Sequence, residues 1–410
     1  MVLVTELELP QINTLDENLR GDVYRELMGA VEGHDGWLAQ APFGFITLDR
    51  ESGEFFLRSR EVMFPSMTLA VLFNVTEGPL HEEISKNLIT RHGADHNRLR
   101  ALVNPALAPR RADAYRPAIQ AILAELMDQL SDALDGAERI EFVGRFAKPF
   151  TSRVIAHVLG APREDAPKLH YWSNLIQRQF DPASLMDPAV LAEIEQGVVD
   201  CYAYIDALIE SRRTEPADNL VTDLIGAEEA GEKLNHDELR NLIFSVLLGG
   251  VDTTQSQLGH TIRLLAQHPE QWRLLRERPR ELAQAAADEA LRYEPITPFT
   301  ARMTTSELEH RGVTFPENTV VLVSAWHANR DGIENADAYD ITAQGEGLRL
   351  LTFGAGIHYC VGANLARAEL QEGLVMLAEA LREVHLDGEP QYGTPSGIYG
   401  LDSLPLRFVR

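Results

Sequence analysis

Segment 351–367 (LTFGAGIHYCVGANLAR) places one cysteine among three glycines at the start of an expected helix. Glycine adopts backbone angles that other residues avoid, and it lets the chain approach a flat partner closely. Free backbone amides at a helix start favour an anion, here the thiolate of Cys360. A thiolate in this position can bind heme iron axially and push electron density toward bound oxygen. The segment also fits a small cysteine buried at a tight turn, so residue chemistry alone leaves both interpretations open.

Residues 249–254 (GGVDTT) form a second candidate site inside a long apolar stretch. Each glycine inside a helix costs about 1 kcal/mol relative to alanine, so a compensating role is expected. Thr253 follows Gly249 by four residues, and its hydroxyl can therefore reach the Gly249 carbonyl and loosen the helix locally. Asp252 and Thr253 could then relay protons to bound dioxygen. Close packing at a helix crossing is the alternative explanation for these glycines.

Helices are expected to position both segments. Residues 191–208 carry apolar side chains three and four positions apart, which predicts a single buried helical face. Asn235 opens a capping sequence, and an apolar helix is expected over 239–267. Another helix is expected to end near Tyr293, and the last helix to begin just after Cys360.

Few segments are typical of strands. Residues 44–58 predict a β-hairpin, in which GFITLD and EFFLR flank a turn at 51–53. Strands are also predicted in VVLVSA at 320–325 and in the tail SLPLRFVR at 403–410. Nothing marks a domain boundary, so residues 1–410 are expected to form one mainly α domain with few strands.

Composition and charge exclude several classes of function. The chain has 410 residues and a net charge of −25, which disfavours general binding of nucleic acid or anionic membranes. Its two cysteines, Cys201 and Cys360, lie in no paired motif, which argues against a disulfide framework or zinc cluster and fits a reducing cytoplasm. Residues 1–10 contain no long apolar run, so neither a signal peptide nor a membrane anchor is expected.

The complete pattern around Cys360 decides between the two interpretations of this cysteine. Residues 353–362 read Phe-Gly-x-Gly-x-His-x-Cys-x-Gly, which resembles the heme-binding signature of the cytochrome P450 superfamily at every fixed position. The resemblance implies that Cys360 ligates the iron of heme b (iron protoporphyrin IX). It also implies that His358 contacts a heme propionate and that Phe353 packs near the sulfur.

Other elements of the same family follow in the expected order. Residues 249–254 resemble its acid–alcohol pair, and this resemblance assigns catalysis to Asp252 and Thr253. Glu289 and Arg292 resemble its ExxR element, a structural pair behind the heme. A lone ExxR would otherwise indicate an ordinary surface ion pair.

Cationic side chains match the family's heme-propionate contacts. His96 and Arg100 resemble its HxxxR element, and Arg302 resembles another propionate-binding arginine. Each of these alone would more often be a solvated charge. In all, the resemblance assigns cofactor binding to eight residues: His96, Arg100, Gly249, Arg302, Phe353, His358, Cys360 and Gly362.

Two positions depart from the family pattern. Ala343 stands where the family usually has an arginine that completes the ExxR network. Leu350, preceded by Arg349, stands where many bacterial members have a histidine. A small insertion within 343–348 would account for these departures. They leave open which residue completes the network, and one propionate contact.

The resemblance implies the family's single triangular fold, mainly α with small β-sheets, and a heme-thiolate monooxygenase. Such an enzyme inserts one oxygen atom from dioxygen into a hydrophobic small molecule, by hydroxylation or epoxidation. The bacterial type that the chain resembles is soluble and cytoplasmic, and external ferredoxin and ferredoxin reductase supply its electrons. Family position puts largely apolar pocket walls in segments 65–90, 180–185, 246–253, 296–300 and 397–399.

An acidic ferredoxin would be repelled by the net charge of −25, so docking requires a local basic patch. Arg110 and Arg111 supply a small one, in a region that family members place on the side of the cysteine ligand. A solvated turn, or pairing with nearby acids such as Asp113, is the other interpretation of these two arginines.

Three alternative functions remain. A peroxide-driven heme peroxygenase would not need Asp252 and Thr253. A heme-binding sensor or carrier would bind gases without electron-driven product formation. A cysteine hydrolase would use Cys360 and His358, but these residues lie two apart on a turn, and no oxyanion-stabilising group is evident.

Overall fold

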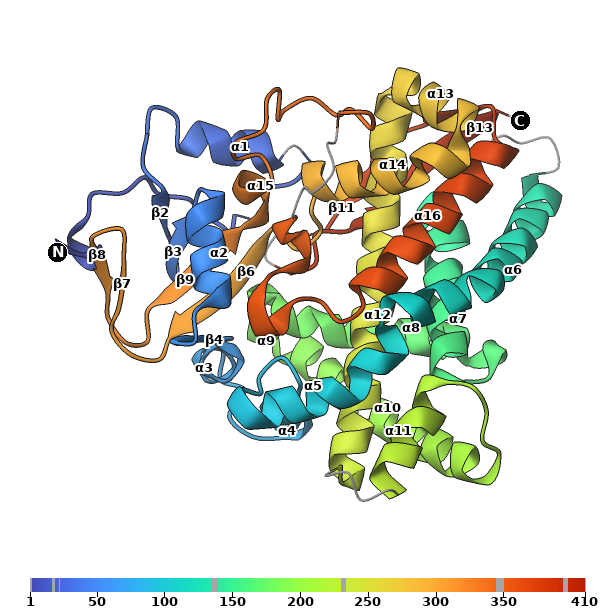
Figure 1. The fold of residues 1–410 in the computed structure, drawn as a ribbon, viewed down its shortest axis with the longest axis horizontal. Coiled ribbons are helices and arrows are strands. Elements are labelled where there is room, and N and C mark those ends of the chain that lie inside the picture. The colour runs from blue at the N-terminus through green and yellow to red at the C-terminus, as the bar shows by residue number, and fades with distance from the viewer. Residues whose placement is uncertain are drawn as a thin grey trace.

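Helices dominate the protein, and a small β-rich region lies at one side of them (Figure 1). The computed structural model describes residues 2–16, 19–21, 23–134, 139–229, 234–343, 350–393 and 397–409. No helix in these ranges is both long and apolar enough to cross a membrane. The α-helices are α1 (Val23–Ala30), α2 (Arg50–Arg58), α3 (Ser66–Leu72), α4 (Pro79–Lys86), α5 (Gly93–Leu107), α6 (Pro109–Leu134), α7 (Lys148–Leu159), α8 (Ala166–Gln177), α9 (Pro182–Met186), α10 (Pro188–Thr214), α11 (Leu220–Glu229), α12 (His236–Gln267), α13 (Pro269–Glu277), α14 (Pro279–Tyr293), α15 (Ala325–Ala328) and α16 (Ala363–Ala380).

The described strands form four small sheets. The largest has the order β2-β3-β9-β6-β4, and the others have the orders β1-β8-β7, β10-β13-β5 and β11-β12. In the largest sheet β3 runs parallel to β9, with Phe45 opposite Val321. The strands are β1 (Val2–Leu3), β2 (Leu38–Ala41), β3 (Gly44–Thr47), β4 (Val62–Met63), β5 (Arg139–Glu141), β6 (Phe299–Thr304), β7 (Leu308–His310), β8 (Val313–Phe315), β9 (Val320–Ser324), β10 (Glu383–Leu386), β11 (Gln391–Tyr392), β12 (Leu401–Ser403) and β13 (Pro405–Val409).

Helix α12 crosses the helical side of the molecule and packs against α7, α8 and α14 (Figure 1). Its start is fixed by a reciprocal capping box: the Asn235 side chain accepts from the Glu238 amide, and Glu238 accepts from the Asn235 amide. Most of its side chains are buried, so a helix with apolar residues on nearly every face is stable here. The predicted capped helix over 239–267 is therefore confirmed.

Most other predicted elements are also confirmed. The apolar face over 191–208 lies in α10, the helix ending at Tyr293 is α14, and α16 begins three residues after Cys360. The strands predicted at 320–325 and 403–410 correspond to β9 and β13. The mainly α fold class with small β-sheets is confirmed as well.

The β-hairpin predicted over 44–58 is wrong in its second half. Residues 44–47 are strand β3, but its antiparallel partner is the preceding β2, and residues 50–58 form helix α2. The Asp49 side chain caps this helix by accepting from the Ser52 amide at 2.8 Å. Ser52, Gly53, Phe56 and Leu57 are its buried residues, a helical spacing rather than a strand's alternation.

Candidate functional site

The backbone of the cysteine loop is shaped by two glycines and closed by one hydrogen bond. Gly354 and Gly356 have φ values of 69° and 71°, in the left-handed region that favours glycine. A Cβ atom at Gly356 would also lie 2.4 Å from the Leu57 carbonyl oxygen of α2. The Cys360 amide donates to the Phe353 carbonyl at 2.9 Å. The loop conformation is thus held by backbone groups and does not depend on the cysteine side chain.

The Cys360 residue is exposed and stands just before helix α16. Desolvation by the surrounding protein raises the pKa of its thiol. The backbone N–H groups of Gly362 and Ala363 lower it, as do the charges of Arg100 and Arg367. The expected set of amides at the helix start is therefore present, and it can stabilise a thiolate once a metal cation replaces the proton.

Phe353 is expected near the sulfur, and its carbonyl accepts the hydrogen bond from the Cys360 amide. Its ring carries the Arg367 guanidinium, whose central carbon lies 4.6 Å from the ring centroid. Arg367 is also paired with Asp288 of α14 at 3.0 Å. These contacts tie the cysteine loop to the body of α16 and α14.

A cluster of basic side chains surrounds His358. The rings of His96 and His358 lie with centroids 4.6 Å apart, and those of His92 and His358 lie 5.8 Å apart. The pKa of His358 is lowered to about 3, mainly by desolvation and then by the neighbouring Arg302, His96, His92 and Arg100 in that order. The structure therefore brings together the four predicted propionate-binding residues, from α5, β6 and the cysteine loop.

This basic cluster fits an anionic partner. Among the described residues, no carboxylate forms an ion pair or hydrogen bond with His92, His96, Arg100, Arg302 or His358. Arg302 is 3% exposed, and desolvation alone lowers its pKa to about 10. The Nε2 atoms of all three histidines are buried and have no hydrogen-bond partner in the described chain. Buried polar groups without partners are costly, so the cluster matches the paired carboxylates of a heme edge.

His92 is a member of the cluster that sequence reasoning missed. It occupies the N-cap position of α5 and precedes His96 by four residues, so both imidazoles lie on the same side of the helix start. The His-x-x-x-His spacing was the available signal. That signal is weak, because such a pair also occurs on solvated helices.

The glycine pair of α12 serves two purposes. A Cβ atom at Gly250 would lie 2.5 Å from Ile155 Cδ1 of α7, so Gly250 permits a close helix crossing. A Cβ atom at Gly249 would meet nothing within 4 Å, and this residue is exposed although Leu247 and Leu248 before it are buried. The packing explanation therefore holds for Gly250, whereas Gly249 borders open space.

Thr253 and Asp252 lie beside this open position. The Thr253 hydroxyl donates to the Gly249 carbonyl at 2.6 Å, as its spacing predicts. Asp252 is 8% exposed and accepts from the Asn174 side chain of α8 at 3.3 Å. Desolvation raises the pKa of Asp252 to about 6, against the lowering effects of Asn174 and of the Lys148 charge. A carboxyl group with this pKa can both take up and release protons near neutral pH.

Glu289 and Arg292 form a buried, bidentate ion pair with both N–O distances at 2.8 Å. Arg292 also donates to the carbonyls of Ala336 and Ala338, at 2.7 and 2.9 Å. Glu289 accepts from the Asp340 amide at 3.0 Å. Backbone groups of 336–340 thus contribute to the network that the Ala343 departure left open, and Arg349 lies outside the described residues.

Several of the expected pocket-wall segments are adjacent. A Cβ atom at Gly397 would lie 3.7 Å from Asp181 Cβ, so the 397–399 segment touches the 180–185 segment. The Tyr399 amide donates to the Ile296 carbonyl at 2.8 Å, which joins it to the 296–300 segment. Gln177, just before the 180–185 segment, donates to the Leu248 carbonyl of α12 at 2.9 Å.

Comparisons with known proteins agree with this geometry. The chain matches the family model described as cytochrome P450 over residues 74–391. It is 34% identical over 404 residues to luteothin monooxygenase of Streptomyces thioluteus, covering 98% of this chain and 96% of that protein. It is 35% identical over 308 residues to mycinamicin IV hydroxylase/epoxidase of Micromonospora griseorubida, covering 74% and 75%. The solved structure of CalO2 matches with a TM-score of 0.88 at 26% identity, covering 98% of this chain and 99% of that one.

These matches cover most of the chain and are spread over several bacterial relatives. Family membership implies heme b as the cofactor, and the basic cluster beside the exposed Cys360 fits that group. The chain belongs to the cytochrome P450 family and is a heme monooxygenase.

Proposed function

We propose that residues 1–410 form a single heme-thiolate monooxygenase domain that works in the cytoplasm on a hydrophobic small molecule. The observation that carries this proposal is the basic cluster around His358. The cluster has no carboxylate partner in the described chain, and His358 precedes Cys360 by two residues. Cys360 is the iron ligand. Bound heme supplies the activation of dioxygen.

The chain's own residues hold and orient the heme. His96, Arg100, Arg302 and His358 bind its propionates, and His92 joins them. Gly362 lies beside the sulfur, where its backbone N–H bonds the Cys360 side chain and a Cβ atom would make an ordinary contact with Sγ at 4.0 Å. Gly249 and Phe353 complete the cofactor-binding set, Gly249 from α12 and Phe353 from the cysteine loop.

Asp252 and Thr253 supply protons on the side of the heme where dioxygen would bind. Thr253 keeps its hydroxyl at the opening beside Gly249, and Asp252 exchanges protons at a pKa of about 6. Because a peroxide-driven enzyme needs no such pair, this geometry favours the use of dioxygen with external electrons.

The substrate is proposed to be hydrophobic because the adjoining wall segments are largely apolar. They include Leu185 and Val246, which are 6% and 7% exposed. The relatives named luteothin monooxygenase and mycinamicin IV hydroxylase/epoxidase support an organic small molecule as the substrate. A ligand screen read by the iron spin-state spectrum tests this, because a substrate that displaces iron-bound water shifts the Soret band.

Substitution of Thr253 or Asp252 should separate electron use from product formation. Thr253→Ala should still consume NADPH but release more of the oxygen as peroxide, because the hydroxyl that positions protons is lost. Asp252→Asn should slow turnover about 100-fold, the usual range for loss of a general acid–base group. The spin-state shift that a ligand induces in the Asp252→Asn variant should be nearly the same as in the parent protein. NADPH oxidation, peroxide and product are measured together.

Thr254→Ala is the matched control, because Thr254 is adjacent and buried but lies outside the pair. It should retain the coupling of the parent protein. Parent-like coupling and rate in both Thr253→Ala and Asp252→Asn would remove the proposed proton role.

The proposed electron donor is a ferredoxin, reduced by a ferredoxin reductase. Arg110 is exposed at the start of α6, close to the cysteine side, since the Leu107 carbonyl accepts from Asn364 of α16 at 3.2 Å. Arg111 is bidentately paired with Asp218 and bonds Tyr115, and Asp113 pairs with Arg116 instead. Arg110 is therefore the better docking candidate of the two arginines.

Arg110→Glu should slow the first electron transfer several-fold at low salt. The difference should shrink as salt screens the interaction, with a Debye length of about 10 Å at 0.1 M. Stopped-flow reduction across an ionic-strength series measures this, with Arg273→Glu on α13 as a charge-matched control. If the Arg110 and Arg273 variants gave equal rates at every salt concentration, Arg110 would not belong to the docking surface.

A further inference from the structure

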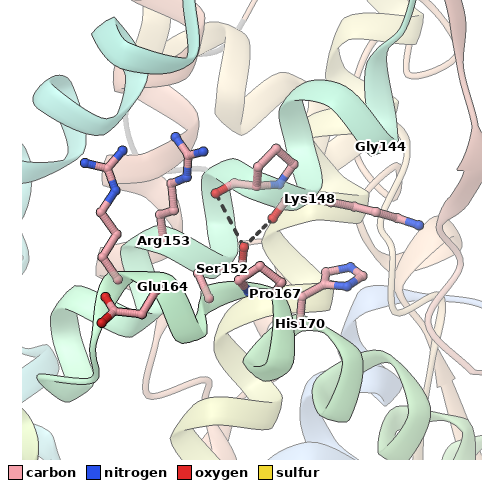
Figure 2. Close-up of a pocket in the computed structure, with 10 residues that line it drawn as sticks. Gly144, Lys148, Ser152, Arg153, Glu164, Pro167 and His170 are labelled. Atoms are coloured by element: carbon pink, nitrogen blue, oxygen red, sulfur yellow. Dashed lines mark hydrogen bonds between the residues drawn. The ribbon is translucent and has the colours of Figure 1, made fainter. Parts of the chain in front are cut away.

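An open cavity of approximately 610 Å³ lies between α7 and α8 (Figure 2), and its lining includes no residue of the cysteine loop. Six of its ten lining residues are polar or charged, among them Lys148, Arg153, Glu164 and His170. In Figure 2 Lys148 and His170 extend to the same side of the cavity. An open cavity of this size with charged lining residues admits water.

His170 connects this cavity to α12. It lines the cavity and also contacts Gln255 of α12, with Nε2 3.0 Å from Gln255 Oε1. One helical turn further along α8, Asn174 donates to the Asp252 carboxylate at 3.3 Å. The two contacts form successive rungs between the helices, because Gln255 follows Asp252 by three residues and Asn174 follows His170 by four.

The electrostatics link the same groups. The charge of Lys148, which lines the cavity, lowers the pKa of both His170 and Asp252. This one residue therefore acts on both of the α8–α12 contacts. Desolvation is the larger cause for His170 and lowers its pKa, which leaves a neutral imidazole at pH 7. Around Asp252, the facing groups are Asn174 from α8, Lys148 from α7 and Asp402 from β12.

We propose that the α7–α8 cavity is the solvent side of a proton route to Asp252, with His170 as its relay and Asn174 as a positioning residue. This rests on the proposed role of Asp252. When Nε2–H donates to Gln255, Nδ1 is the free acceptor of His170. Nδ1 takes a proton from cavity water, and bulk water restores that proton. The Nε2–H proton leaves its hydrogen bond with Gln255 and passes through a bridging water to the Asp252 carboxylate, so the His170 ring ends in its other tautomer.

The step from His170 to Asp252 spans about one helical turn, ~5–6 Å. One hydrogen-bonded water bridges such a distance, because each of its bonds is about 2.8 Å long. Asn174 keeps one carboxylate oxygen of Asp252 directed at α8, the side from which the proton arrives. The amides of Asn174 and Gln255 hold the geometry and carry no proton themselves.

The route can be tested in the holoenzyme without an identified substrate. NADPH oxidation is driven by excess plant-type [2Fe–2S] ferredoxin and its reductase, in H₂O and in D₂O, across the pH range around 6. His170→Phe removes the relay, and Pro167→Trp places a large side chain at an exposed lining position. Lys168→Trp on the same helix and His157→Phe on α7 are matched controls, because neither position lines the cavity.

Both route variants should lower the rate about tenfold and enlarge the solvent isotope effect, with an unchanged carbon monoxide spectrum. Both control variants should behave like the parent. Asn174→Leu should raise the pKa of Asp252, because the hydrogen bond from Asn174 lowers it. A pH titration of the infrared band of the protonated carboxyl group measures the pKa of Asp252 in the resting protein. The band is assigned to Asp252 if it is absent from the Asp252→Asn variant.

The outcomes separate the route from the function on which it rests. If Asp252→Asn slows turnover but His170→Phe and Pro167→Trp match the parent in rate and isotope effect, the cavity is not the route. An unshifted carboxyl titration in Asn174→Leu would overturn the positioning role of Asn174. If Asp252→Asn itself is silent in a protein with intact thiolate ligation, the proposed role of Asp252 fails, and the route fails with it.

Discussion

Cys360→His should abolish the red-shifted Soret band that thiolate-ligated heme shows in its reduced, carbon monoxide-bound state. A neutral imidazole supplies no thiolate, so the electron donation that shifts the band is lost completely. The loop around the residue should persist. Its conformation comes from Gly354 and Gly356 and from the Cys360 amide bond to the Phe353 carbonyl, none of which involves the sulfur.

The matched control is Cys201→Ala. Cys201 is fully buried on α10, and burial raises its pKa, so it is a packed thiol without access to a metal. This variant should keep the thiolate band, and circular dichroism should show a native helix content for both variants. A Cys360→His protein that retained the red-shifted band would show that another residue ligates the iron.

The cysteine loop could be predicted from sequence because its determinants are close together in the chain. Gly354, Gly356, His358, Cys360 and Gly362 lie within nine residues, and each has a local backbone or ligand role. Thr253 and Gly249 were predictable for the same reason, since a hydroxyl four residues after a carbonyl reaches it in any helix.

Features that depend on packing between distant segments could not be predicted in this way. His92 belongs to the basic cluster only because α5 lies against the cysteine loop. Asn174 bonds Asp252 only because α8 packs beside α12. Asn174 carries no sequence signal of this contact, and the His-x-x-x-His spacing of His92 and His96 is too weak to separate it from a pair on a solvated helix.

The incorrect hairpin has a different physical cause. Its second half, EFFLR, has strand-like aromatic residues, and its turn residues fit a hairpin equally well. The Asp49 cap competes with that pattern and wins, because the resulting helix buries Phe56 and Leu57 together. Tertiary burial therefore decided an element whose local propensities were balanced.

Arg292→Ala should lower the free energy of unfolding by about 3–5 kcal/mol, the usual cost of removing one partner from a buried ion pair. The Arg292 and Glu289 side chains are 3% and 2% exposed, so water cannot replace the lost contacts. The substitution leaves the buried Glu289 carboxylate without its positive partner. It also removes the hydrogen-bond donors to the carbonyls of Ala336 and Ala338. Urea unfolding of the holoprotein measures the change.

Arg278, the N-cap residue of α14, offers a matched control. Arg278 and Glu281 are also three residues apart at 2.9 Å, but their side chains are 47% and 64% exposed. Arg278→Ala should therefore cost less than about 1 kcal/mol, the usual limit for a solvated ion pair. If Arg292→Ala cost no more than Arg278→Ala, the network would not stabilise the fold behind the heme. A large difference would show that burial, rather than the ExxR spacing alone, gives the pair its structural role.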